Sequence, residues 1–167
     1  VYGGGKGETA VVTDIPHVNI GYNATTMNAL ATVEYPAGID PTQYVAKVTG
    51  SVFGGGNAAA VNGSPVVTLD KINSEVGDLY GGGNAAGITG STTVTMNNGR
   101  VTDGIYGGCN TSGTVTGNST VNLLGGTIGT ASNTARIFGG GFGQTTMVDG
   151  NVHVTFGNEA GTATPKS

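Results

Sequence analysis

The sequence predicts an all-β fold, a right-handed parallel β-helix (β-solenoid) of about five coils of roughly 27 residues, with an insertion in the first coil. One observation is a step of an aliphatic residue, an aromatic residue and a run of glycines. It occurs five times, starting at Val1, Val52, Leu79, Ile105 and Ile137. A second is a valine-centred alternating segment that follows each aromatic residue by 14 to 16 positions. A third is that no segment has the 3.6-residue period of a helix. A unit this small cannot bury its apolar face alone, so the copies must stack.

The aliphatic–aromatic–glycine step is the first element of each repeat. We expect its aliphatic residues to form an inner column and its aromatic residues a ladder on the outer side. The glycines that follow allow positive φ or a close backbone approach at a corner. Just beyond them, asparagine side chains can form hydrogen bonds from one repeat to the next. The expected structural ladder comprises Tyr2, Phe53, Tyr80, Tyr106, Phe138, Asn57, Asn84 and Asn110.

The alternating segment is the second expected strand, and a short apolar segment after it is the third. In residues 93–96, alternation places Val94 and Met96 on one face and two threonines on the other. His17 and His153 precede equivalent valines, so they are expected in one column, four coils apart. The third strand is marked by Val48, Val76, Val101 and Ile128.

The chain is expected to be one domain, residues 1–167, with an insertion at residues 21–46 and a C-terminal tail at residues 157–167. The insertion is interpreted as a side hairpin or covering loop, or as a degenerate extra coil. It carries three candidate ligand-binding tyrosines, Tyr22, Tyr35 and Tyr44. The sequence starts inside a repeat, and no amphipathic cap is evident at either end. We therefore expect the ends to meet other copies or further repeats.

Composition excludes several classes of function. The net charge is −4 and the six basic residues are scattered, which argues against nucleic-acid binding. No apolar run approaches the ~20 residues of a membrane span. One cysteine, Cys109, allows no internal disulfide. Together with the low lysine content, this favours an extracellular or cell-surface setting.

The sequence offers candidates for two further kinds of site, an ice-binding face and a catalytic carboxylate pair. Threonines at Thr68, Thr93, Thr95 and Thr120 are candidates for an ice-binding face, in which regularly spaced methyl and hydroxyl groups match ordered water. Four carboxylates are candidates for a polysaccharide-cleaving pair: Asp70, Glu75, Asp78 and Asp103. Corner carboxylates are usually solvated, so we expect no enzyme, no catalytic residue, no metal site and no cofactor.

The aliphatic-Tyr-Gly-Gly-Gly-Asn string recurs with Thr-Val-Thr or Thr-Val-Asn strands and with Gly-Gly-Thr-Ile-Gly at residues 125–129. This combination resembles the glycine-rich repeats of large secreted bacterial surface proteins, adhesin-like or of unassigned role, found especially in gut Bacteroidota. The resemblance implies an extracellular β-solenoid segment of a longer surface or fibre-forming protein, with no catalytic residue to transfer.

The expected function is a structural or adhesive module that associates head to tail into a fibre or adjoins further repeats of a longer chain. A glycan or host surface is a further candidate partner, while nucleic acid and membrane insertion are not expected. Carbohydrate binding and ice binding are the alternatives, ahead of polysaccharide cleavage.

Overall fold

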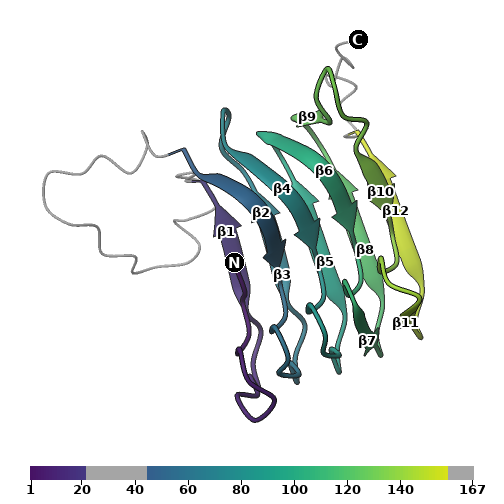
Figure 1. Cartoon of the computed structure of the whole chain (residues 1–167). Helices are drawn as coiled ribbons and strands as arrows, with labels where there is room; N and C mark the ends of the chain where they lie inside the picture. Colours follow the sequence, from purple (N-terminus) through teal and green to yellow (C-terminus); the bar gives the residue numbers. More distant parts are fainter. Residues whose placement is uncertain (22–44, 158–167) are drawn as a thin grey trace, which may run out of the picture.

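The computed structural model describes residues 1–21 and 45–157, which form twelve strands joined by turns, without a helix in these ranges. The strands run in chain order from one end of the molecule to the other (Figure 1). They are β1 (His17–Ile20), β2 (Lys47–Phe53), β3 (Val66–Leu69), β4 (Glu75–Tyr80), β5 (Thr92–Met96), β6 (Arg100–Tyr106), β7 (Ser112–Val115), β8 (Ser119–Leu123), β9 (Thr127–Ile128), β10 (Arg136–Phe138), β11 (Thr145–Val148) and β12 (Val152–Phe156).

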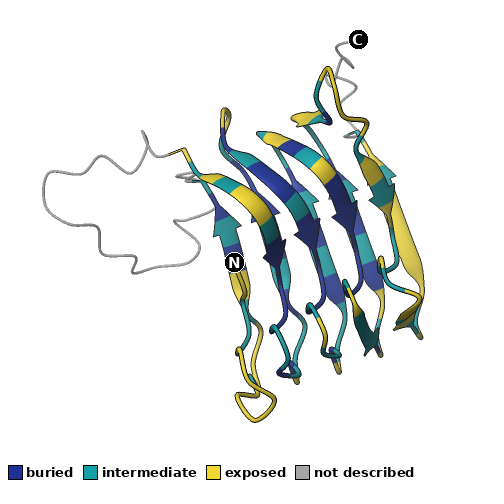
Figure 2. Cartoon of the chain, viewed as in Figure 1, coloured by how far each residue is buried: buried dark blue, intermediate teal, exposed yellow. Residues whose placement is uncertain are grey.

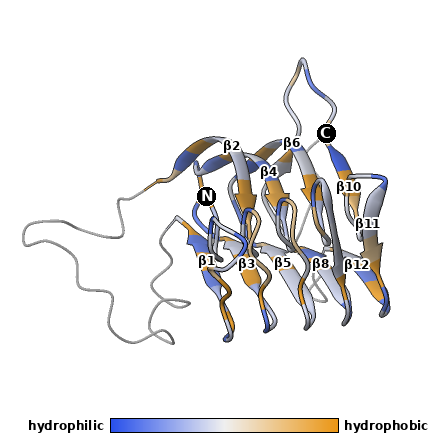
Figure 3. Cartoon of the chain, turned by 60° about the horizontal axis from the view of Figure 1, so that its bottom comes forward, coloured by the Kyte–Doolittle hydropathy of each residue, from blue (hydrophilic) through white to orange (hydrophobic). Residues whose placement is uncertain are grey.

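The strands form three parallel sheets. One has the order β1-β3-β5-β8-β12, the second has the order β10-β6-β4-β2 with β9 also paired to β6, and the third is the pair β11-β7. Each strand pairs with the equivalent strand of the neighbouring repeat, so Val67 lies beside Val94 and Leu79 beside Ile105. The two long sheets face each other across the core (Figure 3).

The predicted fold class, a right-handed parallel β-helix of about five coils, is wrong. The described residues form three separate parallel sheets, and none of them is closed. The prediction assumed three regular strands in every repeat. The third side of the structure is not the predicted third strand at Val48, Val76, Val101 and Ile128, and the first three repeats contribute only isolated bridges to it, at Val12, Val61 and Ile88. The glycine- and asparagine-containing turns between sheets interrupt the extended backbone. All-β content is the part of the prediction that the structure shows.

The aromatic step and the predicted third strand form one element in β2, β4 and β6, whereas β9 and β10 keep them apart in the last repeat. Val76 and Leu79 both belong to β4, and the register of this strand shifts between Val76 and Asp78. Strict alternation would send residues three apart to opposite faces, whereas an irregularity of one residue returns both to the same face. Val76 and Leu79 therefore both enter the core, and Tyr80 faces the other way.

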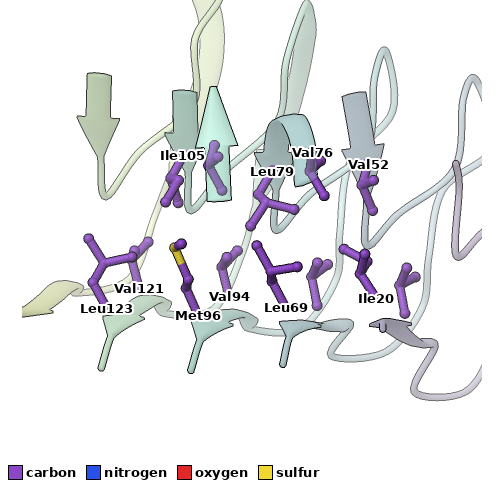
Figure 4. Packing of buried hydrophobic residues seen from close by; sticks show 13 residues of the cluster. Ile20, Val52, Leu69, Val76, Leu79, Val94, Met96, Ile105, Val121 and Leu123 are labelled. Atoms are coloured by element: carbon purple, nitrogen blue, oxygen red, sulfur yellow. The ribbon is translucent and has the colours of Figure 1, made fainter. Parts of the chain in front are cut away.

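The main core lies between the two long sheets, where side chains from both sides meet (Figure 4). Its centre is fully buried, and burial decreases toward both terminal repeats (Figure 2). The buried members are Val18, Ile20, Val52, Val67, Leu69, Val76, Leu79, Val94, Met96, Val101, Ile105, Val121 and Leu123. A smaller cluster fills the third side: Val61, Ile88, Cys109 and Val115.

The glycine runs bring successive repeats into close backbone contact. A Cβ added at Gly55 would lie 2.7 Å from the backbone nitrogen of Gly83, and one at Gly108 would lie 2.7 Å from that of Gly141. No glycine of these runs has positive φ in the described residues. Close approach, rather than left-handed backbone, is therefore why glycine occupies these positions.

Candidate functional site

The five aromatic residues of the repeated step form one continuous stack. Neighbouring ring centroids lie 4.8, 4.9, 4.6 and 5.6 Å apart from Tyr2 to Phe138, with interplanar angles of 6° to 12°. Such spacings are those of favourable aromatic pairs. The stack runs through all five repeats, on the opposite face of the sheet from the aliphatic core.

The middle of this stack is buried, although the stack lies on the face of the sheet away from the aliphatic core. Phe53, Tyr80 and Tyr106 are each 4% exposed, because each ring is covered on both faces by its neighbours. The Tyr106 ring also folds back over Gly104, where a Cβ would lie 2.6 Å from the ring edge. The terminal rings are different: Tyr2 is 43% and Phe138 48% exposed.

Burial raises the pKa of the Tyr80 and Tyr106 hydroxyls above the ordinary tyrosine value, and the negative charge of Asp78 raises both further. An unperturbed tyrosine is already protonated at neutral pH, so this increase in pKa affects the protein only in alkaline solution.

The asparagine column is a chain of side-chain hydrogen bonds. Asn84 Nδ2 donates to Asn57 Oδ1 over 2.8 Å, and Asn110 Nδ2 donates to Asn84 Oδ1 over the same distance. The backbone pairing places Lys6 and Phe142 at the equivalent positions of the terminal repeats. The amide chain therefore covers only the three middle repeats.

Asp78 and Asp103 lie in neighbouring repeats, and each accepts hydrogen bonds. Ser51 Oγ donates to Asp78 over 3.0 Å, while Thr102 Oγ1 and Asn133 Nδ2 donate to Asp103 over 2.9 and 2.6 Å. Burial raises the pKa of Asp78, the Ser51 hydrogen bond lowers it, and the charge of Asp103 raises it.

The other two candidate carboxylates are separately engaged. Buried Asp70 accepts a hydrogen bond of 2.7 Å from Asn97 Nδ2, and Glu75 forms an ion pair of 3.3 Å with Lys47. Within residues 1–21 and 45–157, no group of three His, Cys, Asp or Glu side chains could hold a metal ion. Each of the four carboxylates thus accepts a hydrogen bond or forms an ion pair, and Asp78 and Asp103 are close enough for the charge of one to affect the pKa of the other.

The Asp78→Asn variant is expected to unfold at the same or a higher temperature than the wild type at pH 7. A carboxyl whose pKa is raised by folding contributes stability only below its unfolded pKa, near 3.9, and loses this contribution as the pH rises through the folded pKa. At pH 7 the charged Asp78 carboxylate is therefore destabilised by burial. An asparagine amide has no charge to bury, and its oxygen can still accept the hydrogen bond from Ser51. Thermal unfolding at pH 7 and pH 3 measures the difference in unfolding temperature between the variant and the wild type. This difference should be smaller at pH 3. Exposed Asp149→Asn is the control for net charge, and a larger loss of stability at Asp78 would contradict the interpretation.

The candidate ice-binding threonines lie on the sheet β1-β3-β5-β8-β12. Its register places Thr93 beside Thr120, and Thr68 beside Thr95. Thr68 is buried at 8% exposure, and the other three are half-buried. Ice binding by these threonines stays a prediction. Tyr22, Tyr35 and Tyr44, the candidate ligand-binding residues of the insertion, lie outside the described residues, as do residues 158–167.

The most distinctive surfaces are two terminal faces, at which the columns of the repeat end. The N-terminal face presents Val1 and Tyr2 of the aromatic step. The edge strand of the first long sheet at this face is β1, in which Val18 and Ile20 are buried. The C-terminal face is formed by β10, β11 and β12 (Figure 1). Its exposed apolar side chains include Phe138, Val152, Val154 and Phe156, at 48%, 49%, 39% and 66% exposure. The sequence pattern did not single out these side chains. Their signal was present, because Val154 and Phe156 occupy core columns in the last repeat and Phe138 is the last ring of the aromatic stack.

No family model, no curated protein and no solved structure matches the chain. The resemblance to glycine-rich bacterial surface repeats therefore stays a prediction. No helix in the described ranges has the length and apolar character needed to cross a membrane.

Proposed function

We propose that this chain is an extracellular structural or adhesive module that associates end to end through its two terminal faces. The observation that carries the proposal is that core columns of the repeat end in exposed apolar side chains at the C-terminal face. Phe156 is 66% exposed, although its partner Leu123 in the same column is 5% exposed. Covering Phe156 with another repeat would extend the same apolar column.

Backbone pairing supports the same function. The strands β1 and β12 are the edges of a five-stranded parallel sheet, and each has one side with no strand beside it in the described ranges. Unpaired N–H and C=O groups on an edge strand form a template for a strand of another chain. A second copy can supply this strand, since equivalent strands already pair throughout the molecule.

The polar side chains favour a structural role over catalysis. The candidate carboxylates accept hydrogen bonds or an ion pair, and the asparagines are bonded to one another. These interactions link one repeat to the next, as a load-carrying module requires. The extracellular setting rests on the low charge and on the sequence resemblance.

Assembly is tested by negative-stain electron microscopy and light scattering of the purified chain over a range of concentrations. We expect rods or threads that lengthen with concentration. The Phe156→Lys variant should stay monomeric, because a lysine charge would be buried at the joint. Ile72→Lys is the matched control: Ile72 is 59% exposed but lies between β3 and β4, away from the terminal strands. A wild-type protein that stays a monodisperse monomer at high concentration for weeks would contradict the proposal.

A further inference from the structure

We propose that two copies meet in the same register that joins neighbouring repeats within the chain. In this junction the C-terminal face of one copy stacks on the N-terminal face of a second copy. Phe138 then lies on Tyr2, and β12 pairs in parallel with β1, with His153 beside His17. This inference rests on the proposed function and specifies its partner, a second copy, and its geometry.

The strand registers define which residues would meet. Pairing places His17 beside Val66, Val66 beside Thr93, Thr93 beside Thr120, and Thr120 beside His153. The two histidines are therefore the first and last members of one column. Both are exposed, so neither blocks the approach of a second copy. One more step of the same register brings His153 of one copy beside His17 of the next.

The aromatic stack indicates the same partner. Its middle rings are 4% exposed, whereas Tyr2 and Phe138 are ten times more exposed because a ring covers only one face of each. Phenylalanine–tyrosine pairs already stack at 4.8, 4.9 and 5.6 Å within the chain. Placing Phe138 on Tyr2 repeats this contact and covers both remaining faces.

One column of equivalent glycines lies against the backbone of the next repeat. A Cβ added at Gly4, Gly55, Gly82 or Gly108 would lie 2.6 to 2.9 Å from a backbone nitrogen of the next repeat. Gly140 is the last member of this column, and a Cβ there would meet nothing within 4 Å. The chain thus has glycine where its own structure leaves room for a side chain. A second copy in the same register would place the backbone nitrogen of Gly5 against Gly140, so that only glycine fits.

The first experiment tests this contact with Gly140→Ala. Because the added methyl group meets nothing within the molecule, we expect unchanged thermal unfolding of the monomer. Assembly should weaken at least tenfold, because the methyl group would collide with the backbone of the second copy. Gly7→Ala is the matched control, since its Cβ also meets nothing within 4 Å and it lies in a turn outside the column. Unchanged assembly of Gly140→Ala would overturn the proposed register.

Disulfide trapping tests the register directly. Adjacent strands lie about 4.8 Å apart, within the Cα separation that a disulfide spans. The double variant His17→Cys with His153→Cys should form a ladder of covalent multimers on a non-reducing gel. His17→Cys with Thr155→Cys is the register control: a shift of two residues separates the Cα atoms by about 8 Å, too far for a disulfide. Cys109 does not interfere, because its side chain is fully buried and burial raises the pKa of its thiol.

The outcomes of these experiments distinguish a failure of the proposed register from a failure of the proposed function. A wild-type chain that forms no assemblies contradicts the proposed function itself. If the wild type assembles but disulfides form through Cys at position 155 and not at position 153, the proposed function stands and the proposed register is wrong. Covalent dimers of the single variant His17→Cys or His153→Cys would show that like faces meet, which also overturns the register.

Discussion

Replacing Gly55 with alanine is expected to lower the free energy of unfolding by about 3 kcal/mol or more. The added Cβ would lie 2.7 Å from the Gly83 backbone nitrogen and 2.8 Å from Ile88 Cδ1. The backbone contact cannot be relieved by a change of rotamer. Two repeats would have to separate, and the parallel pairing on both sides of the turn would be strained. Urea unfolding followed by circular dichroism measures the loss.

The matched control for Gly55→Ala is Gly140→Ala, which makes the same change at the end of the same column. Its Cβ meets nothing within 4 Å, so the free energy of unfolding should stay within about 0.5 kcal/mol of the wild type. Both variants are compared at concentrations at which the protein is monomeric. Equal decreases in the free energy of unfolding of Gly55→Ala and Gly140→Ala would show that contact with the next repeat does not cause the destabilisation.

Replacing Tyr80 with alanine is expected to cost about 3–5 kcal/mol, the usual range for truncating a buried aromatic residue. The Tyr80 ring is 4% exposed and stacks on Phe53 at 4.9 Å and on Tyr106 at 4.6 Å. Its removal leaves a gap in the middle of the stack and exposes one face of each neighbouring ring. Chemical unfolding of the variant measures this cost.

Tyr80→Phe is the control that separates ring stacking from the hydroxyl. Phenylalanine already occupies two positions of the stack, so stability at pH 7 should change little. The stabilities of the wild type and Tyr80→Phe should differ at alkaline pH. Folding raises the pKa of Tyr80, so its stabilising contribution is complete below the unfolded pKa near 10 and is lost as the pH rises through the folded value. The wild type should therefore lose more stability than Tyr80→Phe above about pH 10. Equal alkaline losses would contradict this assignment.

The positions of candidate site residues could be predicted only in part. The repeat spacing identified equivalent residues, and the structure places these beside one another, as it does for His17 and Val66 or Tyr80 and Tyr106. The carboxylate partners could not be predicted, because Asn133, which bonds Asp103, lies in a turn that follows no repeat pattern. Burial of Thr68 could not be predicted either, since alternation assigns a face of the strand but not what covers that face.

The sequence by itself determined that the chain is all-β and which residues of successive repeats are equivalent. Both depend on local spacing, which parallel pairing preserves. Only the tertiary structure decided that the strands form three open sheets, that Val76 and Leu79 share one irregular strand, and that the middle aromatic rings are buried. The physical reason is that sheet boundaries and burial depend on how neighbouring repeats pack. An exposed ring at Phe138 and a buried ring at Tyr106 follow the same local sequence pattern and differ only in whether another repeat lies beyond them.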